Sequence, residues 1–411
     1  MEQINYTWLE NLANKYGTPF YLMNSCVYEN NVTQFVTSLK KYYEKIIVGY
    51  SFKTNYVPAL CQKALALGCY AEVVSAMEFD LALKIGFSNI IFNGPIKKYD
   101  YLTKAFDLGV IINLDSEYEI DYVLEYRKRN PKKLMKVGLR VNIELKDSEG
   151  NSVIQNGLRS GRFGFSKQLL PNVIDVLRTN GIVINSIHGH TSSSDRAAIN
   201  YETIVNYMLM ICNEFKLDNI EYFDIGGGFF GAAANGIDVS NKPTYCDYSD
   251  IIFKNLLKSN WFNKTKPFLI IEPGASVVSN VFSYVSKVYQ LKEMNGKVFV
   301  TTDGTVFDVK PTMHKNNLPF KLYSKNNNTN SILCDFVGST CMEKDVILSD
   351  VSMQKPNFGD FVKIDGVGAY TMALTPSFIN YVSPIIDISN DNSKLVRRRQ
   401  VLKDITDLYV F

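Results

Sequence analysis

Eight short apolar runs alternate with helix-length segments along the first two thirds of the chain, and this alternation constrains the fold most. The runs are Ile46 to Lys53, Cys69 to Ser75, Ile90 to Pro95, Gly109 to Asp115, Lys136 to Asn142, Val183 to His190, Tyr222 to Gly228 and Phe268 to Gly274. The segments between them, such as Ala76 to Ile85 and Tyr201 to Phe215, show helical apolar spacing. We therefore predict an α/β fold, a closed (β/α)8 barrel of the TIM type. A doubly wound open sheet stays the alternative, because a count of strands cannot show closure.

The pattern changes after Gly274. The runs Val281 to Tyr289, Lys297 to Thr302, Ser331 to Val337 and Phe361 to Ile364 are strand-like and have no helical segments between them. We predict a barrel domain over residues 30–275 and a mainly antiparallel β domain over residues 276–411, which residues 1–29 join.

The composition is that of an ordinary globular protein. Among the 411 residues, 46% are hydrophobic and 21% are charged, and the net charge of +3 offers no basic surface for nucleic acid. We expect neither a nucleic-acid nor a membrane partner, since no apolar stretch is long enough to span a bilayer. The seven cysteines contain no CxxC pair and the N-terminal residues do not resemble a signal peptide. A cytoplasmic location is therefore expected.

Polar residues end nearly every apolar run. They are Lys53, Glu72 with Ser75, Asn93, Asp115, Arg140 with Asn142, His188 with His190, Asp224 and Glu272. One such residue could be a helix cap or a turn residue, but capping alone does not explain polar endings on almost every strand. The carboxyl ends of barrel strands form the face that carries the active site, so these residues predict its position.

Four features in these endings suggest one cofactor. Lys53 follows a buried strand, where loss of solvent can make its amine nucleophilic, although a lone lysine at a strand end more often extends to the surface. Gly226, Gly227 and Gly228 let backbone amides approach an anion such as a phosphate. His190 lies in an HxH pair that suits either a metal or a stacked ring, and the absence of cysteine ligands favours the ring, so we expect no metal. Glu272 could pair with a protonated ring nitrogen, and together the four describe pyridoxal phosphate.

The chain also resembles a known family along nearly its whole length. It is similar to the fold-type III pyridoxal-phosphate decarboxylases, the diaminopimelate and ornithine decarboxylase group. The matching motifs are Tyr50 to Asn55, Glu72 to Ser75, Arg162 to Gly164, His188 to His190 with Ser193, Asp224 to Gly228, Glu272 to Gly274, Gly338 to Asp345, Gly366 to Tyr370 and Val396 to Gln400. The last of these is similar to the diaminopimelate branch.

The resemblance implies a role for each matching residue. Lys53 would be the covalent attachment point of the cofactor, and His190 would stack on its ring. Glu272 would pair with the ring nitrogen, Tyr370 would lie near the phosphate, and Cys341 would protonate the carbanion in the partner's site. The other implied cofactor-binding residues are Glu72, Ser193, Gly226, Gly227, Gly228 and Gly274. A homodimer with shared active sites follows from the role of Cys341.

Three departures from the family pattern concern the substrate. Ala275 stands where the family has arginine, and Met342 stands where it has an acidic residue that binds the distal amine of a substrate. Lys310 stands near an expected arginine and cannot bind a carboxylate in bidentate fashion. The predicted substrate-binding residues are Lys310, Met342, Glu343 and Tyr370. We expect an α-decarboxylase for an amino acid whose distal end is amidated, conjugated or carried on a larger scaffold.

Two alternatives remain open at this stage. An amino-acid racemase on the same fold would need two opposed bases and no interface cysteine, so Cys341 counts against it. A non-catalytic homologue that regulates a partner would not need Lys53, Glu272 and the glycine loop, although Ala275 is compatible with weakened cofactor binding.

Overall fold

The computed structural model describes residues 4–147, 149–154, 158–326, 329–390 and 393–410. The chain divides into two compact units. The barrel unit comprises residues 31–231 and 240–276, and the β unit comprises residues 1–30, 232–239 and 277–411. Residues 232–239 thus group with the β unit, although they lie within the range predicted for the barrel. The division into a barrel domain over residues 30–275 and a β domain over residues 276–411 stays a prediction.

Eight parallel strands close the barrel in the order of the sequence. They are β2 (Ile46–Ser51), β3 (Tyr70–Val73), β4 (Ile90–Phe92), β5 (Ile111–Leu114), β6 (Lys136–Arg140), β7 (Val183–His188), β8 (Tyr222–Asp224) and β9 (Phe268–Ile271). Closure is made by β2 pairing with β9, with Ile46 opposite Leu269. The predicted barrel is confirmed and the open-sheet alternative is wrong.

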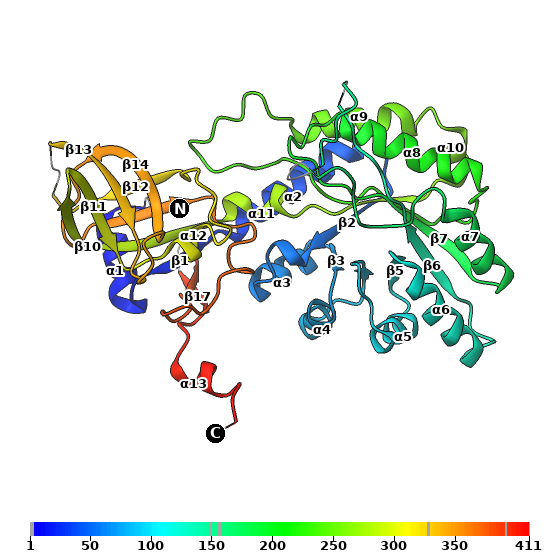
Figure 1. Ribbon diagram of the computed structural model, residues 1–411, viewed down its shortest axis with the longest axis horizontal. Coiled ribbons are helices and arrows are strands. Elements are labelled where there is room, and N and C mark those ends of the chain that lie inside the picture. Colours follow the sequence, from blue (N-terminus) through cyan, green and yellow to red (C-terminus); the bar gives the residue numbers. More distant parts are fainter. Residues whose placement is uncertain (1–3, 148, 155–157, 327–328, 391–392, 411) are drawn as a thin grey trace. The chain divides into compact units, whose positions relative to one another are not determined.

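Helices follow the strands on the outside of the barrel, where Figure 1 shows α4, α5 and α6. The barrel helices are α3 (Pro58–Ala66), α4 (Ala76–Ile85), α5 (Tyr99–Leu108), α6 (Glu117–Arg129), α7 (Leu170–Thr179), α8 (Asn200–Glu214), α9 (Tyr245–Leu256) and α10 (Asn260–Thr265). The predicted helix over residues 76–85 has these same bounds in the structure. Ser75 caps its first turn by accepting a hydrogen bond from the Glu78 amide, and Gly86 ends it in the left-handed region.

The barrel interior has an apolar layer and a polar layer. Ile47, Ile91, Ile111 and Ile270 pack together as a buried cluster. Farther along the strands, the buried side chains are polar, and they are Glu72, Asn93, Asn113, Ser186, Asp224 and Glu272. Because buried polar groups are costly unless they are hydrogen-bonded, this second layer marks the end of the barrel where chemistry is expected.

The β unit contains one nine-stranded sheet within the part of the chain that the structure describes. Its strands are β1 (Phe20–Met23), β10 (Phe282–Met294), β11 (Lys297–Thr302), β12 (Phe320–Tyr323), β13 (Ser331–Val337), β14 (Val346–Gln354), β15 (Phe361–Asp365), β16 (Ile385–Asp387) and β17 (Lys394–Arg397). Most neighbours are antiparallel, as predicted. Two pairs are parallel, β1 with β16 and β11 with β13, so the sheet is mixed.

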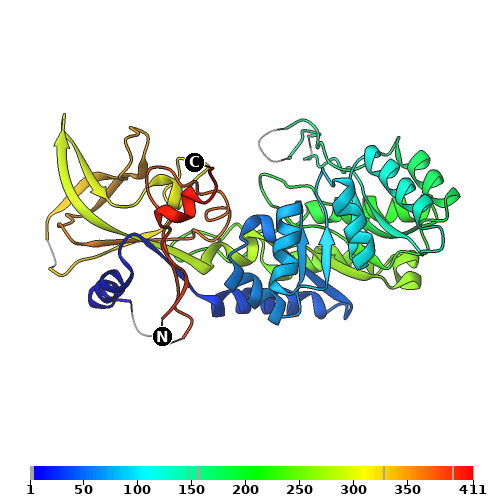
Figure 2. The same cartoon turned by 90° about the horizontal axis from the view of Figure 1, so that it is seen from below.

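Helix α1 (Tyr6–Tyr16) completes the core of the β unit. Its buried Leu9 and Leu12 pack against Phe20, Val285 and other apolar residues of the sheet. Figure 2 shows this helix in blue beside the β-unit strands. The remaining helices are α2 (Ser25–Lys40), α11 (Ala275–Val278), α12 (Val306–Val309) and α13 (Leu402–Thr406). Among the described residues, no helix has the length and apolar character needed to cross a bilayer.

Candidate active site

Lys53 lies just beyond the end of β2, in the short 3-10 helix Phe52–Thr54. Its Nζ is 2.5 Å from Oε2 of Glu72, and the Ser51 hydroxyl donates to the same oxygen at 2.6 Å. The Glu72 side chain is 1% exposed, whereas that of Lys53 is 32% exposed. The amine therefore meets the solvent side of the site, while its carboxylate partner is fixed within the barrel.

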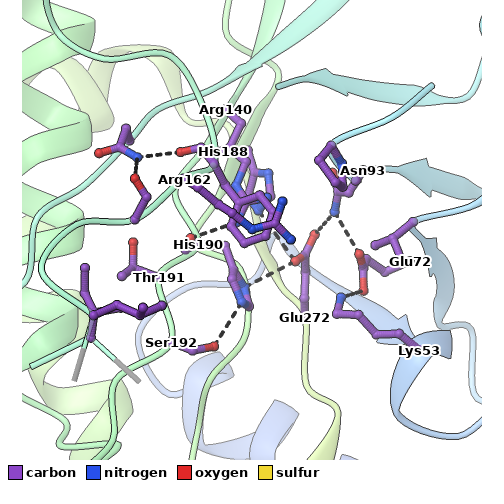
Figure 3. A pocket seen from close by; sticks show the side chains of 18 of the residues that line it. Lys53, Glu72, Asn93, Arg140, Arg162, His188, His190, Thr191, Ser192 and Glu272 are labelled. Atoms are coloured by element: carbon purple, nitrogen blue, oxygen red, sulfur yellow. Dashed lines mark hydrogen bonds and ion pairs between the residues drawn. The ribbon is translucent and has the colours of Figure 1, made fainter. Parts of the chain in front are cut away.

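A cavity of about 520 Å³ opens at this end of the barrel. Figure 3 shows that Lys53, Glu72, Asn93, His190 and Glu272 surround one side of it. The other lining residues among those described are Val74, Gly94, Pro95, Arg140, Asn142, Ile154, Leu158, Ser160, Gly161, Arg162, Phe163, His188, Thr191 and Ser192. Most of the polar strand endings that the sequence singled out therefore line one cavity, whereas Ser75, Asp115 and Asp224 are not among its described lining residues.

Glu272 follows β9 and is the buried anion of the site. Its Oε1 accepts a hydrogen bond of 2.6 Å from Nδ2 of Asn93. Its Oε2 is 3.6 Å from Nε2 of His188 and 3.8 Å from Nδ1 of His190. Burial alone would raise the pKa of Glu272, but His188 and Lys53 outweigh it and hold this pKa well below its usual range. The carboxylate is therefore ionised at neutral pH.

His190 lies against the glycine loop that follows β8. The Gly227 amide donates to Nδ1 of His190 at 2.7 Å. A Cβ added to Gly227 would lie 2.3 Å from the Glu272 carbonyl, and one added to Gly226 would lie 2.5 Å from Cβ of His190. Burial lowers the pKa of His190 well below its usual value, and Arg140 and Lys53 lower it further. The ring is thus neutral, and only glycine allows the loop to approach it so closely.

His188, His190 and Glu272 also have the composition of a metal site, since their ligand atoms lie within 4.8 Å of one another. However, Nδ1 of His190 already accepts the Gly227 amide, so its lone pair is in use. The expectation that these groups serve the cofactor and hold no metal stays a prediction.

The remaining barrel residues of the predicted site lie at its edges. The Ser193 hydroxyl accepts hydrogen bonds from Nδ2 of Asn200 at 2.9 Å and from the Arg196 amide at 3.1 Å. Thr191 and Ser192, rather than Ser193, line the described part of the cavity. Gly228 continues the glycine loop with a φ of 96°, and a Cβ on Gly274 would lie 2.2 Å from the Thr54 hydroxyl. The assignment of Ser193 and Gly228 to phosphate binding, and of Gly274 to cofactor binding, stays a prediction.

The predicted residues of the β unit come from three segments, and hydrogen bonds tie two of them together. Asp345 accepts hydrogen bonds from the Val306 amide at 2.6 Å and from the Thr340 hydroxyl at 2.7 Å, and this ties residues 338–345 to α12. Cys341 and Glu343 are exposed, Met342 is half-buried and Lys310 is buried. Tyr370 lies at 40% exposure with a φ of 59°. Their roles in binding and protonation stay predictions.

The barrel residues fit pyridoxal phosphate. The cofactor needs an amine, a face on which its ring can stack, and an anion for its ring nitrogen. Lys53, His190 and the ionised Glu272 offer these groups around one cavity. Among the described residues, neither ring nitrogen of the buried His188 has a hydrogen-bond partner, so the site holds polar groups that a bound molecule can satisfy.

Several residues of the cavity were not in the predicted site. Asn93 and Arg140 were visible in the sequence only as polar strand endings, and Arg162 was visible only as part of a matching motif. Arg140 pairs with Asp115 at 3.1 Å and also donates to the His190 carbonyl. The sequence could not show which group each of these side chains contacts, because the contacting groups come from neighbouring strands.

Comparison with known proteins agrees with this fold and site. The sequence model of the family described as "Pyridoxal-dependent decarboxylase, pyridoxal binding domain" matches residues 29–279. This match covers more than half of the chain, and it overlaps the barrel unit. Fold and site together define a pyridoxal-phosphate enzyme of the decarboxylase type, and the chain belongs to the pyridoxal-dependent decarboxylase family.

Similar proteins carry the name diaminopimelate decarboxylase. The one from Aquifex aeolicus is 26% identical over 95% of this chain and 91% of its own length. The one from Methanocaldococcus jannaschii is 26% identical over 96% of this chain and 91% of its own length. The M. jannaschii enzyme solved in complex with L-lysine has a TM-score of 0.86 at 24% identity and covers 97% of this chain and 94% of that one. The protein is therefore a pyridoxal-phosphate-dependent carboxy-lyase that acts on an amino acid.

Proposed function

We propose that this enzyme removes the α-carboxyl group from an amino acid whose distal end is amidated, conjugated or carried on a larger scaffold. The observation that supports the assignment of the barrel residues is the arrangement of Lys53, Glu72, His190 and Glu272 around one cavity. Lys53 would hold the cofactor through its amine, with Glu72 as the partner that orients this amine. Glu272 would hold a protonated ring nitrogen, and the neutral ring of His190 would cover one face of the cofactor.

The chemistry divides between the cofactor and the chain. Bound pyridoxal phosphate supplies a ring that accepts the electron pair left when carbon dioxide departs. The ionised Glu272 stabilises a positive charge on the ring nitrogen, because burial strengthens the attraction between the two charges. Cys341, on the exposed turn of the β unit, would return a proton to the α-carbon in the partner's site, which makes a homodimer part of the proposal.

The substrate proposal depends on two positions of this chain. Ala275 cannot contact an anion, and Met342 cannot pair with a distal amine, a charged hydrogen bond that would contribute roughly 1.5–3 kcal/mol. The lining of the cavity also contains the apolar side chains of Val74, Ile154 and Phe163. They support a substrate with apolar surface away from its α-carbon. Free diaminopimelate is the second candidate, because the relatives carry the name of that activity.

A cytosolic location is also part of the proposal. All seven cysteines lie among the described residues and are free thiols, which supports a reducing compartment.

The test is carbon dioxide release from a panel of free, amidated and conjugated amino acids that includes diaminopimelate. We expect turnover with a member of the modified set, and loss of both turnover and visible cofactor absorbance in Lys53→Ala. Lys53→Arg is the matched control, because it keeps the charge beside Glu72 and removes the nucleophilic amine. Fastest turnover with diaminopimelate would overturn the substrate proposal, and exchange of the α-proton without carbon dioxide release would indicate a racemase. A wild-type protein that binds cofactor and releases no carbon dioxide from any substrate would support a regulatory homologue.

A further inference from the structure

The side-chain amide of Asn93 links the two carboxylates of the site. Its Nδ2 donates to Oε1 of Glu72 at 3.1 Å and to Oε1 of Glu272 at 2.6 Å. Figure 3 shows both contacts. Asn93 is 3% exposed, so these hydrogen bonds lie out of solvent. Both hydrogens of the side-chain amide are used, one for Glu72, the partner of Lys53, and one for Glu272.

The orientation of this amide is set by a chain of hydrogen bonds inside the barrel. The Ser186 hydroxyl donates to Oδ1 of Asn113 at 2.8 Å, and Nδ2 of Asn113 donates to Oδ1 of Asn93 at 2.9 Å. Nδ2 of Asn113 also lies 3.4 Å from Oδ2 of Asp224. If the Asn93 amide were reversed, its oxygen would face two carboxylates and its nitrogen would face a donor. The network therefore permits one orientation, with the nitrogen toward Glu72 and Glu272.

The backbone around Asn93 is held as firmly as its side chain. The backbone N–H of Asn93 donates to the Val73 carbonyl at 2.8 Å. Gly94 has a φ of 94°, and a Cβ there would lie 2.4 Å from the Val74 carbonyl. The buried ammonium of Lys97 donates to the Gly94 carbonyl at 2.8 Å. A side chain positioned in this way can act as a fixed donor rather than an adaptable one.

Basic and acidic titratable groups surround the two carboxylates. Lys53 pairs with Glu72, while His188 and His190 face Glu272. The acidic neighbours are Asp224, whose pKa is raised well above its usual value by burial and by Glu272, and Glu78, whose pKa is raised by burial to about 7. Burial therefore favours the protonated form of Asp224, whereas Glu272 stays ionised.

We propose that Asn93 is a positioning residue that holds the carboxylates of Glu72 and Glu272 beside each other. Glu72, the partner of the Lys53 amine, and Glu272, the proposed partner of the ring nitrogen, are thereby oriented together. This inference rests on the proposed roles of Lys53 and Glu272 and assigns a new role to Asn93. It follows that loss of the amide donor disfavours the ionised form of Glu272 and lets Glu72 turn away from Asn93, while the other contacts of each carboxylate remain.

The first test measures protonation in the cofactor-free protein. The ¹³C resonance of the Glu272 side-chain carboxyl, assigned with Glu272→Gln, is followed against pH in the wild type and in Asn93→Leu. We expect the midpoint to rise by roughly one pH unit, because a hydrogen bond to a charged carboxylate favours its ionised form. Asn185→Ala is the matched control, since this barrel asparagine donates to Glu221 on the opposite side from the cavity, and its midpoint should equal that of the wild type.

The second test uses the loaded enzyme. The visible absorbance of bound pyridoxal phosphate is titrated with pH, and the acidic limb of kcat/KM is measured for the same variants. Both should move upward in Asn93→Leu, and also in Asn93→Ala, which removes the amide without adding a charge if the leucine variant fails to fold. An unchanged Glu272 midpoint in both variants overturns the inference, whatever their activity. Cofactor that never binds to the wild type would instead overturn the proposed function, since the carboxyl titration does not depend on it.

Discussion

The buried ion pair between Lys97 and Glu119 provides a quantitative test of the barrel's stability. Neither side chain is exposed, and Nζ of Lys97 is 3.0 Å from Oε1 of Glu119. The other carboxylate oxygen, Oε2, accepts from the Asp115 amide at 2.6 Å and from the Ser116 amide at 3.3 Å. The pair thus joins the segment after β4 to the first turn of α6, and replacing one partner leaves the other charge in a nonpolar environment.

The two single replacements should differ in cost. Removing one partner of a buried pair costs about 3–5 kcal/mol. In Lys97→Met, Glu119 keeps both backbone donors, so we expect a loss near 3 kcal/mol. In Glu119→Leu, two backbone amides also lose their acceptor, so we expect a loss near 5 kcal/mol. Burial lowers the pKa of Lys97 and raises the pKa of Glu119, so either group left alone can lose its charge, which limits both losses.

The assay is guanidinium unfolding followed by tryptophan fluorescence. The chain has two tryptophans, and Trp261 is buried in the barrel unit against Phe223. A Trp8→Phe background therefore makes the signal specific for the barrel. Lys104→Met is the control, because Lys104 pairs with Asp80 at the surface, where such a pair contributes about 0–1 kcal/mol.

The double variant Lys97→Met/Glu119→Leu completes the cycle. We expect it to be more stable than the sum of the single losses predicts, because no charge remains unpaired. The reasoning is refuted if Lys97→Met costs no more than Lys104→Met, since the pair would then contribute no more than an exposed one.

Three further outcomes follow from the site. Burial raises the pKa of Glu78 from 4.5 to about 7. The contribution of Glu78 to stability is therefore complete below pH 4.5 and is lost as the pH rises through 7. In denaturant titrations, the free energy of unfolding of Glu78→Gln should depend less on pH over this range. Gly227→Ala would place a Cβ 2.3 Å from the Glu272 carbonyl and 3.3 Å from the His190 ring, so equilibrium dialysis should show at least about tenfold weaker cofactor binding. Cys341→Ala should leave cofactor absorbance intact and change the ratio of amine to aldehyde products, and an unchanged ratio at an unchanged rate would contradict its assigned role.

The barrel strands were predictable because strands buried on both faces are read as continuous apolar runs. The predicted runs extended past the strands, for example to His190 where β7 ends at His188, because polar residues at the cavity lie in the loops that follow. β1 was not predicted as a strand at all. Its four apolar residues gain their partners from β10 and β16, which lie hundreds of residues away in the sequence.

The residues of the candidate site were predictable where the type of the residue itself indicates a chemical role. Lys53, His190 and Glu272 each have a distinct proposed role, and the structure brings them to one cavity. Asn93 was missed because its importance comes from three partners on other strands, and no local pattern encodes them. Residues of the β unit, such as Cys341, were assigned only by resemblance, since the role proposed for Cys341 involves a second subunit.

The pairing of β1 has a consequence for the order in which the protein is synthesised. Tyr21 lies opposite Ile385, so a strand that leaves the ribosome early pairs with one made more than three hundred residues later. β9 ends at Ile271, so all eight barrel strands exist before the second partner of β1 does. The barrel can therefore form during translation, while the first strand keeps an open edge that can associate with other chains. We expect a ribosome that stalls before residue 385 to leave the N-terminal strand without this partner and therefore prone to aggregation.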